Sequence, residues 1–410
     1  MSVRKRTWTT CGEPRSAWVV DYADQLGRRH LKTFTRKRDA DAYHAQVTVD
    51  VGAGIHTADS RSITVTQAGK LWLASREAAA IERATLRNYG EHLRLHITPL
   101  IGATKLAALT VPFVREFEDR LREDRSPAMV RKVMVSLSGI LSDAQDRGLV
   151  AQNVARNRRG ARNGAVDARA KRRLEIGTDI PTPAEIRAVI AVLGGLGNAM
   201  ARPLLLTAIF TGLRASELRG LRWTDVDLGR SEIHVRQRAD RFGEMGRLKS
   251  AAGRRTVPLL PMVTNALREW KGDNGGGGEL VFPGRRNGVA VLSTIVNGMW
   301  HPAQVSAGLV GADGKAKYSG LHALRHFYAS WCVNRRADGG LELPLKTAQG
   351  RLGHATISMT ADRYGHLFPR GDDGAELAAA ERAFLLPAAV PNGSTDAQNG
   401  APVAAVRPLR

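Results

Sequence analysis

Cysteine is scarce in this chain of 410 residues, which carries only Cys11 and Cys332. Two cysteines so far apart form neither a metal-binding motif nor the disulfide framework of a small secreted domain, so we expect a cytosolic protein with reduced thiols. No apolar run approaches the roughly 20 residues that a transmembrane helix needs. The basic N-terminus also lacks the apolar stretch of a signal peptide. These absences argue against a secreted or membrane-spanning protein.

Acidic residues are also in short supply. The chain has 39 Asp and Glu against 61 Lys and Arg, which gives a formal net charge of +22. This surplus is larger than solubility requires, and it indicates a polyanionic partner, with nucleic acid favoured over an anionic membrane. Hydrophobic residues make up 43% of the chain. That content predicts folded domains, and the length predicts two or three of them.

The first half of the chain predicts two small domains. Residues 1–58 contain two strand patterns, 17–22 and 28–34, and helical spacing from Arg38, which predicts a β-hairpin followed by a helix. A sheet of this kind could lie against DNA, or the module could be a structural cap with a solvated basic face. Residues 62–155 predict a four-helix domain, whose last helix ends near Gly148.

The remaining segments change in composition. Residues 156–175 are rich in Arg, Gly and Asn without an apolar period, which predicts a basic linker that contacts phosphates along a duplex. Residues 176–386 predict a mixed, mostly helical domain with a small antiparallel sheet, and residues 387–410 a disordered tail. The expected fold class is therefore multi-domain, mainly α with α+β parts. The candidate DNA contacts are Arg28, Arg29, Lys32, Arg36, Arg158, Arg159, Lys171 and Arg172.

Six separated polar residues in the second half could together cut a phosphodiester. These residues are Arg214, Lys249, His322, Arg325, His354 and Tyr364. They include neither a pair of carboxylates nor a cluster of metal ligands. A phenol can attack phosphorus when nearby cations stabilise the developing phenolate. Guanidinium groups bind two phosphate oxygens each in a fixed fork, and an ammonium can protonate the leaving oxygen. Each residue also has an ordinary structural explanation, from a surface arginine to a turn lysine or a packed tyrosine.

The order of these residues and their neighbours resembles the tyrosine recombinases, or phage integrases. Thr211-Gly212-Leu213-Arg214 is similar to the first arginine motif of that family, and Leu321-His322-Ala323-Leu324-Arg325 is similar to its His-x-x-Arg motif. Leu352-Gly353-His354 with Tyr364-Gly365-His366-Leu367-Phe368 is similar to its closing motif. The segment around Lys249 resembles the family's β-hairpin lysine. Glu217 resembles a supporting acidic position, which we interpret as a partner of an arginine.

Residues 62–155 resemble the family's core-binding domain in their helical pattern, and residues 1–58 more loosely resemble the arm-binding domains of some phage integrases. The resemblance therefore implies a core-type DNA-binding domain at 62–155, an arm-type DNA-binding module at 1–58, and a site-specific recombinase of a temperate phage or similar mobile element. Tyr364 would form a 3′-phosphotyrosyl link while Lys249 protonates the 5′ oxygen. Arg214, Arg325 and His354 would stabilise the transition state, with His322 as a phosphate contact or a base. Neither metal nor ATP would be required, because the covalent link keeps the bond energy.

The expected partners are double-stranded attachment sites and three further protomers in a homotetramer, with a host DNA-bending protein and an excision factor as further candidates. The apolar helix at 375–386 could dock on a neighbouring subunit or pack on its own domain. Two alternatives remain open: a type IB topoisomerase-like nicking-closing enzyme, and a catalytically silent DNA-binding regulator. The expected location is the cytoplasm of a bacterial host, on its nucleoid.

Overall fold

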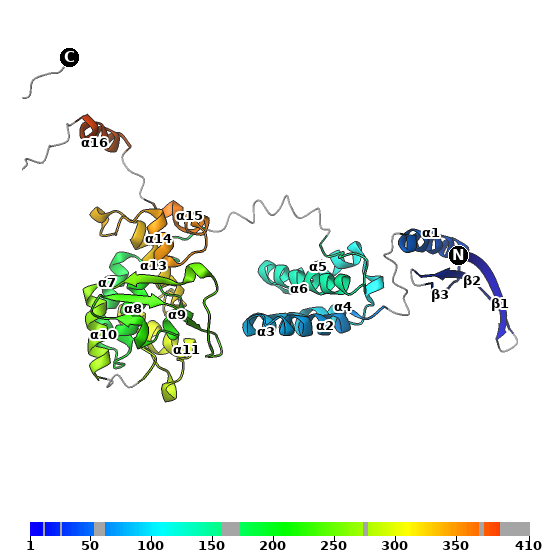
Figure 1. The fold of residues 1–410 in the computed structure, drawn as a ribbon, viewed down its shortest axis with the longest axis horizontal. Coiled ribbons are helices and arrows are strands. Elements are labelled where there is room, and N and C mark those ends of the chain that lie inside the picture. The colour runs from blue at the N-terminus through cyan, green and yellow to red at the C-terminus, as the bar shows by residue number, and fades with distance from the viewer. Residues whose placement is uncertain are drawn as a thin grey trace, which may run out of the picture. The chain divides into compact units, whose positions relative to one another are not determined.

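The computed structural model describes residues 1–10, 13–24, 27–52, 62–156, 173–273, 278–368 and 373–385. The chain divides into two compact units, Met1–Arg172 and Arg173–Arg410. Figure 1 shows the helices and strands of each. Within the described ranges, no helix combines the length and the apolar character needed to cross a membrane. The inferred linker contacts Arg158, Arg159, Lys171 and Arg172, part of the glycine-rich loop at 273–278, and the tail at 387–410 lie outside the described residues.

The N-terminal part of the first unit is a three-stranded antiparallel sheet with one helix against it. Strands β1 (Ser2–Thr10), β2 (Glu13–Ala23) and β3 (Arg29–Phe34) lie in that order, followed by α1 (Lys37–Gly52). Val20 and Tyr22 of β2 pack with Ala40 and Val47 of α1 in a small core. The sequence predicted β2, β3 and α1 but missed β1. Its side chains are almost all exposed, so it carries no burial pattern, and backbone pairing to β2 holds it in place.

The rest of the first unit is helical, as the sequence predicted. The elements are α2 (Val65–Ala78), α3 (Arg83–His92), the π-helical turn η1 (Leu93–Ile97), α4 (Thr98–Ile101), η2 (Leu106–Ala108), α5 (Val111–Asp124) and α6 (Pro127–Asp146). A capping box between Thr64 and Gln67 begins α2. The apolar positions of α6 at i, i+3 and i+4 spacing are buried, and Gly148 follows its end with a φ of +69°.

The second unit mixes helices with two short sheets. Its strands are β4 (Val226–Asp227), β5 (Glu232–Val235) and β8 (Arg255–Pro258) in one antiparallel sheet, and β6 (Arg238–Ala239) with β7 (Met245–Gly246) in a hairpin. Its α-helices are α7 (Pro183–Val192), α8 (Ala201–Thr211), α9 (Ala215–Arg219), α10 (Pro261–Asp273), α11 (Leu292–Ile295), α12 (His301–Ser306), α13 (His322–Val333), α14 (Leu345–Leu352), α15 (Ile357–Tyr364) and α16 (Asp373–Leu385). Short 3-10 or π turns lie between them: η4 (Leu193–Gly195), η5 (Trp223–Asp225), η6 (Ala251–Gly253), η7 (Arg285–Asn287), η8 (Val296–Trp300), η9 (Arg336–Asp338) and η10 (Gly365–Leu367).

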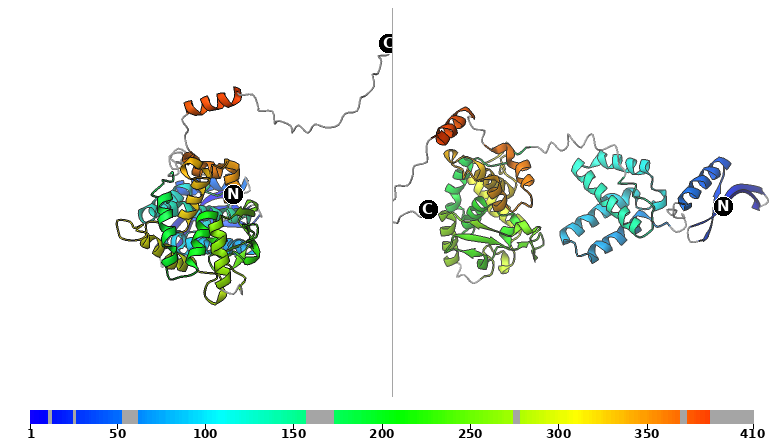
Figure 2. Two further views of the ribbon diagram at one scale, coloured as in Figure 1. Left: turned by 90° about the vertical axis from the view of Figure 1, so that its left-hand side faces the viewer. Right: turned by 45° about the horizontal axis from the view of Figure 1, so that its top comes forward.

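The core of the second unit forms around α8, which is buried on nearly every side and packs against α10 and α13. Helix α13 in turn packs against α14, and α14 contacts both β8 and α15. Helices α14 and α15 lie side by side in each view of this unit (Figures 1 and 2). Segments that are far apart in the sequence therefore meet where α8 and α14 end and α13 begins.

Candidate active site

Arg325 ties together the ends of two helices. It lies on α13 with only 2% of its surface exposed, and its guanidinium donates hydrogen bonds to the carbonyls of Gly212 and Leu352. Those carbonyls lie at the ends of α8 and α14. Burial and the neighbouring Arg214 lower the pKa of Arg325 to about 10, so the side chain stays charged at neutral pH.

Arg214 begins α9 directly after a tight turn. Gly212 has a φ of +60°, and a Cβ there would lie 2.3 Å from the ring of Tyr328, so only glycine fits. Arg214 then donates to Glu217 Oε1 at 2.7 Å and to the Gly353 carbonyl at 3.2 Å. Its side chain is one-third exposed. The guanidinium is thus anchored on one side and open on the other.

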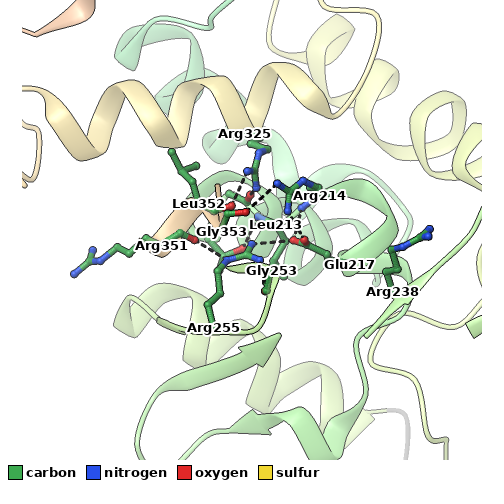
Figure 3. A network of polar contacts seen from close by, with 12 residues as sticks. Leu213, Arg214, Glu217, Arg238, Gly253, Arg255, Arg325, Arg351, Leu352 and Gly353 are labelled. Atoms are coloured by element: carbon green, nitrogen blue, oxygen red, sulfur yellow. Dashed lines mark hydrogen bonds and ion pairs between the residues drawn. The ribbon is translucent and has the colours of Figure 1, made fainter. Parts of the chain in front are cut away.

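Glu217 and Arg255 form the buried base of this network (Figure 3). Arg255 of β8 donates to Glu217 Oε2 at 2.8 Å, to the Arg351 carbonyl at 2.7 Å and to the Gly253 carbonyl at 3.0 Å. Burial alone would raise the pKa of Glu217, but hydrogen bonds and charges from Arg255 and Arg214 outweigh it and lower that pKa. The carboxylate is therefore ionised and holds two arginines, which agrees with the interpretation of Glu217 as an arginine partner.

His354 follows the left-handed residue that ends α14. Gly353 has a φ of +64°, and His354 is buried with Nδ1 2.9 Å from the Thr360 hydroxyl. Burial and the charges of Arg325 and Arg214 lower the pKa of His354 to about 4. The imidazole is therefore neutral at neutral pH and can donate a hydrogen bond to an anion.

Tyr364 is the last residue of α15, and only 2% of it is exposed. Its ring stacks on His354, with 6.2 Å between ring centroids and 5° between ring planes. Its hydroxyl lies 2.8 Å from Nδ1 of His326. Burial raises the pKa of the phenol, and the charges of Arg325 and Arg363 oppose that rise. The phenol is therefore neutral at rest and lies in a positive field that would stabilise a phenolate.

His322 and Lys249 lie at the exposed edge of the cluster. His322 begins α13, and its ring meets that of His326 edge-on, with centroids 4.5 Å apart. Desolvation and the charge of Arg325 lower its pKa. Lys249 lies three residues after β7, in the segment that connects the antiparallel strands β5 and β8. It lines a pocket of about 260 Å³ together with Arg214 and Gly353.

The structure thus brings the six predicted residues to one region of the second unit. His354 stacks on Tyr364, and Arg214 and Arg325 bind the carbonyls of two consecutive residues, Gly353 and Leu352. Two residues that complete this region were missed by sequence reasoning, Arg255 and His326. The only signal for either was its position, because His326 directly follows Arg325 and Arg255 is the second residue of the strand pattern at 254–259. Position in the sequence alone does not show which side chain points toward the site.

The candidate DNA contacts of the first unit differ in their surroundings. Arg28 and Arg36 are exposed. Arg29 pairs with Asp21, and the ammonium of Lys32 lies 4.1 Å from the centroid of the Tyr43 ring. Arg28 and Arg36 therefore present open charges, while Arg29 and Lys32 also hold the sheet and helix together.

Chemically, the region combines a neutral phenol, fixed guanidinium groups, neutral imidazoles and an exposed ammonium. A monoanion with tetrahedral oxygens fits this set, because Arg214 is open toward a pocket that also contains Lys249. Additional negative charge on that anion would be stabilised by donors that need no rearrangement.

Comparison with known proteins found tyrosine recombinases among the sequence relatives of this chain. Residues 182–370 match the model of the phage integrase family. A XerC-like tyrosine recombinase of Caldanaerobacter subterraneus subsp. tengcongensis is 24% identical over 369 residues, covering 85% of this chain and 90% of the relative. The tyrosine recombinase XerC of Xylella fastidiosa (strain 9a5c) is 35% identical over 167 residues, covering 40% of this chain and 48% of that protein.

Two groups of solved structures share the fold. The Tn1549 transposon integrase in complex with a circular intermediate DNA has a TM-score of 0.59 at 19% identity, covering 78% of this chain and 100% of that one. The lambda integrase tetramer bound to a Holliday junction has a TM-score of 0.54 at 16% identity, covering 86% and 96%. At such identities the likeness shows a common fold.

Proposed function

The chain belongs to the tyrosine recombinase family, and from this premise we propose that it is the integrase of a phage or similar mobile element, which cuts and rejoins DNA through a 3′-phosphotyrosyl intermediate. The proposal rests on the placement of Tyr364. Its hydroxyl is buried within a group of arginines and neutral histidines, and Arg214 and Lys249 line an adjoining pocket.

In the proposed reaction the oxygen of Tyr364 forms a bond to phosphorus as the bond from phosphorus to the 5′ oxygen breaks. The phenol loses its proton, and Lys249 supplies one to the departing 5′ oxygen. Arg214, Arg325 and His354 stabilise the charge that gathers on the non-bridging oxygens. The 5′ hydroxyl of a partner duplex then reverses the step. His322, at the exposed edge, receives the proton of the phenol, or contacts the phosphate while that proton passes to water.

Arg325 and His354 fit these roles because each already has the required charge state before DNA binds. Arg325 remains protonated with a pKa of about 10, and His354 remains neutral with a pKa of about 4. Both are held by backbone or hydroxyl partners. Removing one preorganised donor from such a site costs about 3–4 kcal/mol of transition-state stabilisation.

The proposed assembly on DNA is a homotetramer, since two exchanges through a four-way junction need four cleaving subunits. Support comes from α16, whose Leu377, Phe384 and Leu385 are 70%, 88% and 69% exposed. Such side chains gain from burial against another subunit. A chain truncated before α16 should still bind one core site, but it should fail to form the four-subunit complex in a sizing experiment on junction DNA.

The exposed Arg28 and Arg36 support a further part of the proposal, in which residues 1–58 bind DNA through phosphate contacts. Replacing both with Gln should weaken binding to long attachment-site DNA and reduce the slope of log affinity against log salt by about two. The partner DNA would be that of a bacterial host, on its nucleoid, with a DNA-bending protein and an excision factor as accessory partners.

The decisive experiment uses a nicked suicide duplex from the attachment region of the element. Wild-type protein should form a covalent adduct, and Tyr364→Phe should bind the duplex without forming one. An adduct that survives Tyr364→Phe would refute the assignment of the nucleophile. Absence of an adduct with every duplex tested would favour the silent DNA-binding regulator. Relaxation of a plasmid without a target site would favour a topoisomerase-like enzyme.

A further inference from the structure

His326, which is not among the six predicted residues, contacts the hydroxyl oxygen of Tyr364, the nucleophile of the proposed reaction. His326 lies on α13 directly after Arg325, and 6% of it is exposed. Its Nδ1 is 2.8 Å from the hydroxyl oxygen of Tyr364, on a helix 38 residues further along the chain. The two rings are tilted by 57° with centroids 5.8 Å apart. The contact is therefore made edge to edge through the polar atoms.

We propose that His326 is a further functional residue of this site, which accepts a hydrogen bond from the Tyr364 hydroxyl and so fixes the direction of its lone pairs. This inference rests on the proposed function, because it assigns a role toward the nucleophile named there. A phenol has one proton and two lone pairs. Once the proton points to Nδ1, the lone pairs of the oxygen face the remaining directions, and one of them is free for attack on phosphorus.

The direction of the hydrogen bond follows from the donors available. A phenol gives up its proton more readily than a neutral imidazole does, so the phenol is the better donor in this pair. The proton of His326 then lies on Nε2. His326 is kept neutral because burial, together with the charges of His322, Arg363 and Arg325, lowers its pKa to about 3, and the opposing charge of Asp179 does not offset them.

The lowered pKa of His326 also shows that it does not act as a general base toward Tyr364. The pKa of His326 is about 3, whereas burial raises the pKa of Tyr364 above its ordinary value of about 10. A full transfer of the proton from Tyr364 to His326 would therefore be strongly unfavourable. His326 can orient the hydroxyl but cannot keep its proton.

One other side chain and the helix that carries Tyr364 complete the orientation of the phenol. His354 stacks on the ring face, and α15 places Tyr364 at its last turn. Stacking limits tilting of the ring, but it does not select the rotation of the O–H bond. That rotation is left to the hydrogen bond with His326, which is why its loss should slow the chemical step.

The test compares His326→Leu with His326→Asn. The two side chains have similar shapes, but only asparagine can place an amide oxygen near the position of Nδ1. The adduct-forming rate should be measured in a single turnover on the nicked suicide duplex, with protein in excess so that binding is saturated. We expect His326→Leu to be slower than wild type by about 10²-fold, the loss caused by a misplacement of about 1 Å in an oriented reaction. His326→Asn should recover at least about tenfold of that loss.

A matched control separates this role from the loss of a buried histidine. His92 in the first unit is 8% exposed, and its Nδ1 lies 2.8 Å from the hydroxyl of Ser136. His92→Leu removes the same kind of contact and should leave the single-turnover rate within about threefold of wild type. Equal rates for His326→Leu and His326→Asn, or a wild-type rate for His326→Leu, would overturn the proposal.

A measurement on unaltered His326 covers the case in which His326→Leu fails to fold. In protein labelled with ¹⁵N at histidine, Nδ1 of His326 should show the resonance of an unprotonated nitrogen. That resonance should shift when Tyr364→Phe removes the hydroxyl. A protonated Nδ1, or no shift, would contradict the inferred hydrogen bond. If wild type forms no Tyr364-dependent adduct, the proposed function itself fails, whereas a Tyr364-dependent adduct that is indifferent to His326 refutes only the present inference.

Discussion

Replacement of Arg255 by methionine should destabilise the second unit and slow DNA cleavage, although Arg255 is not among the residues proposed to contact the phosphate. The change keeps an unbranched side chain but removes the charge and all five donors. Glu217 would lose one of its two arginine partners, and the carbonyls of Arg351 and Gly253 would lose their donor.

The expected magnitude follows from burial. The side chains of Arg255 and Glu217 are 5% and 3% exposed. Removing one partner of such a buried pair costs about 3–5 kcal/mol. Glu217 would keep the guanidinium of Arg214 at 2.7 Å and its backbone N–H at 3.0 Å, which favours the lower end of that range. For a unit of this size, about 3 kcal/mol corresponds to a decrease in Tm of roughly 6–12 °C.

The matched control is Arg202→Met. Arg202 also pairs with a glutamate, Glu269, but these side chains are 40% and 60% exposed. A surface pair of this kind contributes about 0–1 kcal/mol, so the Tm should fall by less than about 4 °C. Urea denaturation of the full chain gives the free energies, and hydrogen exchange in α13 assigns the affected transition to the second unit.

The same variants should differ in cleavage. Arg255→Met frees Glu217 to move, and with it the guanidinium of Arg214, so the single-turnover rate should fall by about 10-fold or more at saturating DNA. Arg202→Met should cleave at the wild-type rate. Equal stability losses in the two variants would refute the reasoning, because burial would then not decide the strength of the pair. Wild-type cleavage by Arg255→Met would refute its role in holding Arg214.

Three further predictions concern neighbouring residues. Gly353→Ala should cost about 2 kcal/mol in the free energy of unfolding and slow cleavage, because its φ is +64° and a Cβ would lie 2.9 Å from Arg255 Nη1; urea denaturation and the adduct assay check this. Lys249→Met should slow adduct formation by about 10²–10⁴-fold with little loss of stability, since Lys249 is exposed, and a substrate with sulfur at the 5′ bridging position should restore the rate because a thiolate leaves unprotonated. In the folded protein the pKa values of His354 and His326 are about 4 and about 3, whereas an unfolded histidine has a pKa of about 6.5. The unfolded state therefore binds more protons, and the free energy of unfolding should decrease as the pH is lowered below about 6.5. The loss should be roughly 2 kcal/mol per histidine between pH 7 and pH 5, and an unchanged urea midpoint at pH 5 would contradict the lowered values.

Much of the secondary structure could be predicted because local signals were strong. The apolar period of α6, the capping boxes of α2 and α7, and the glycine after α8 each mark a boundary within a few residues. Strand β1 could not be predicted in this way. Its residues face solvent, and its conformation depends on hydrogen bonds to β2 rather than on an apolar pattern of its own.

The candidate site was predictable for a different reason. Its residues occur in short segments whose order resembles a family, so Arg214, Lys249, His322, Arg325, His354 and Tyr364 could be named before any contact was known. Arg255 and His326 could not be named, since each directly follows another basic residue, Arg254 or Arg325, and the sequence does not show which of the two faces the site. Only packing shows that Arg255 turns to Glu217 and that His326 turns to Tyr364.

The sequence by itself determined which reactive groups the chain carries, their order, and the excess of positive charge that suits a DNA partner. The tertiary structure decided what those groups can do. Arg214 reaches the carbonyl of Gly353, 139 residues away, and Arg325 bridges the ends of α8 and α14. The physical reason is that a hydrogen-bond network and the pKa of a buried group depend on distances and desolvation, which arise only when α8, α13, α14 and α15 pack together.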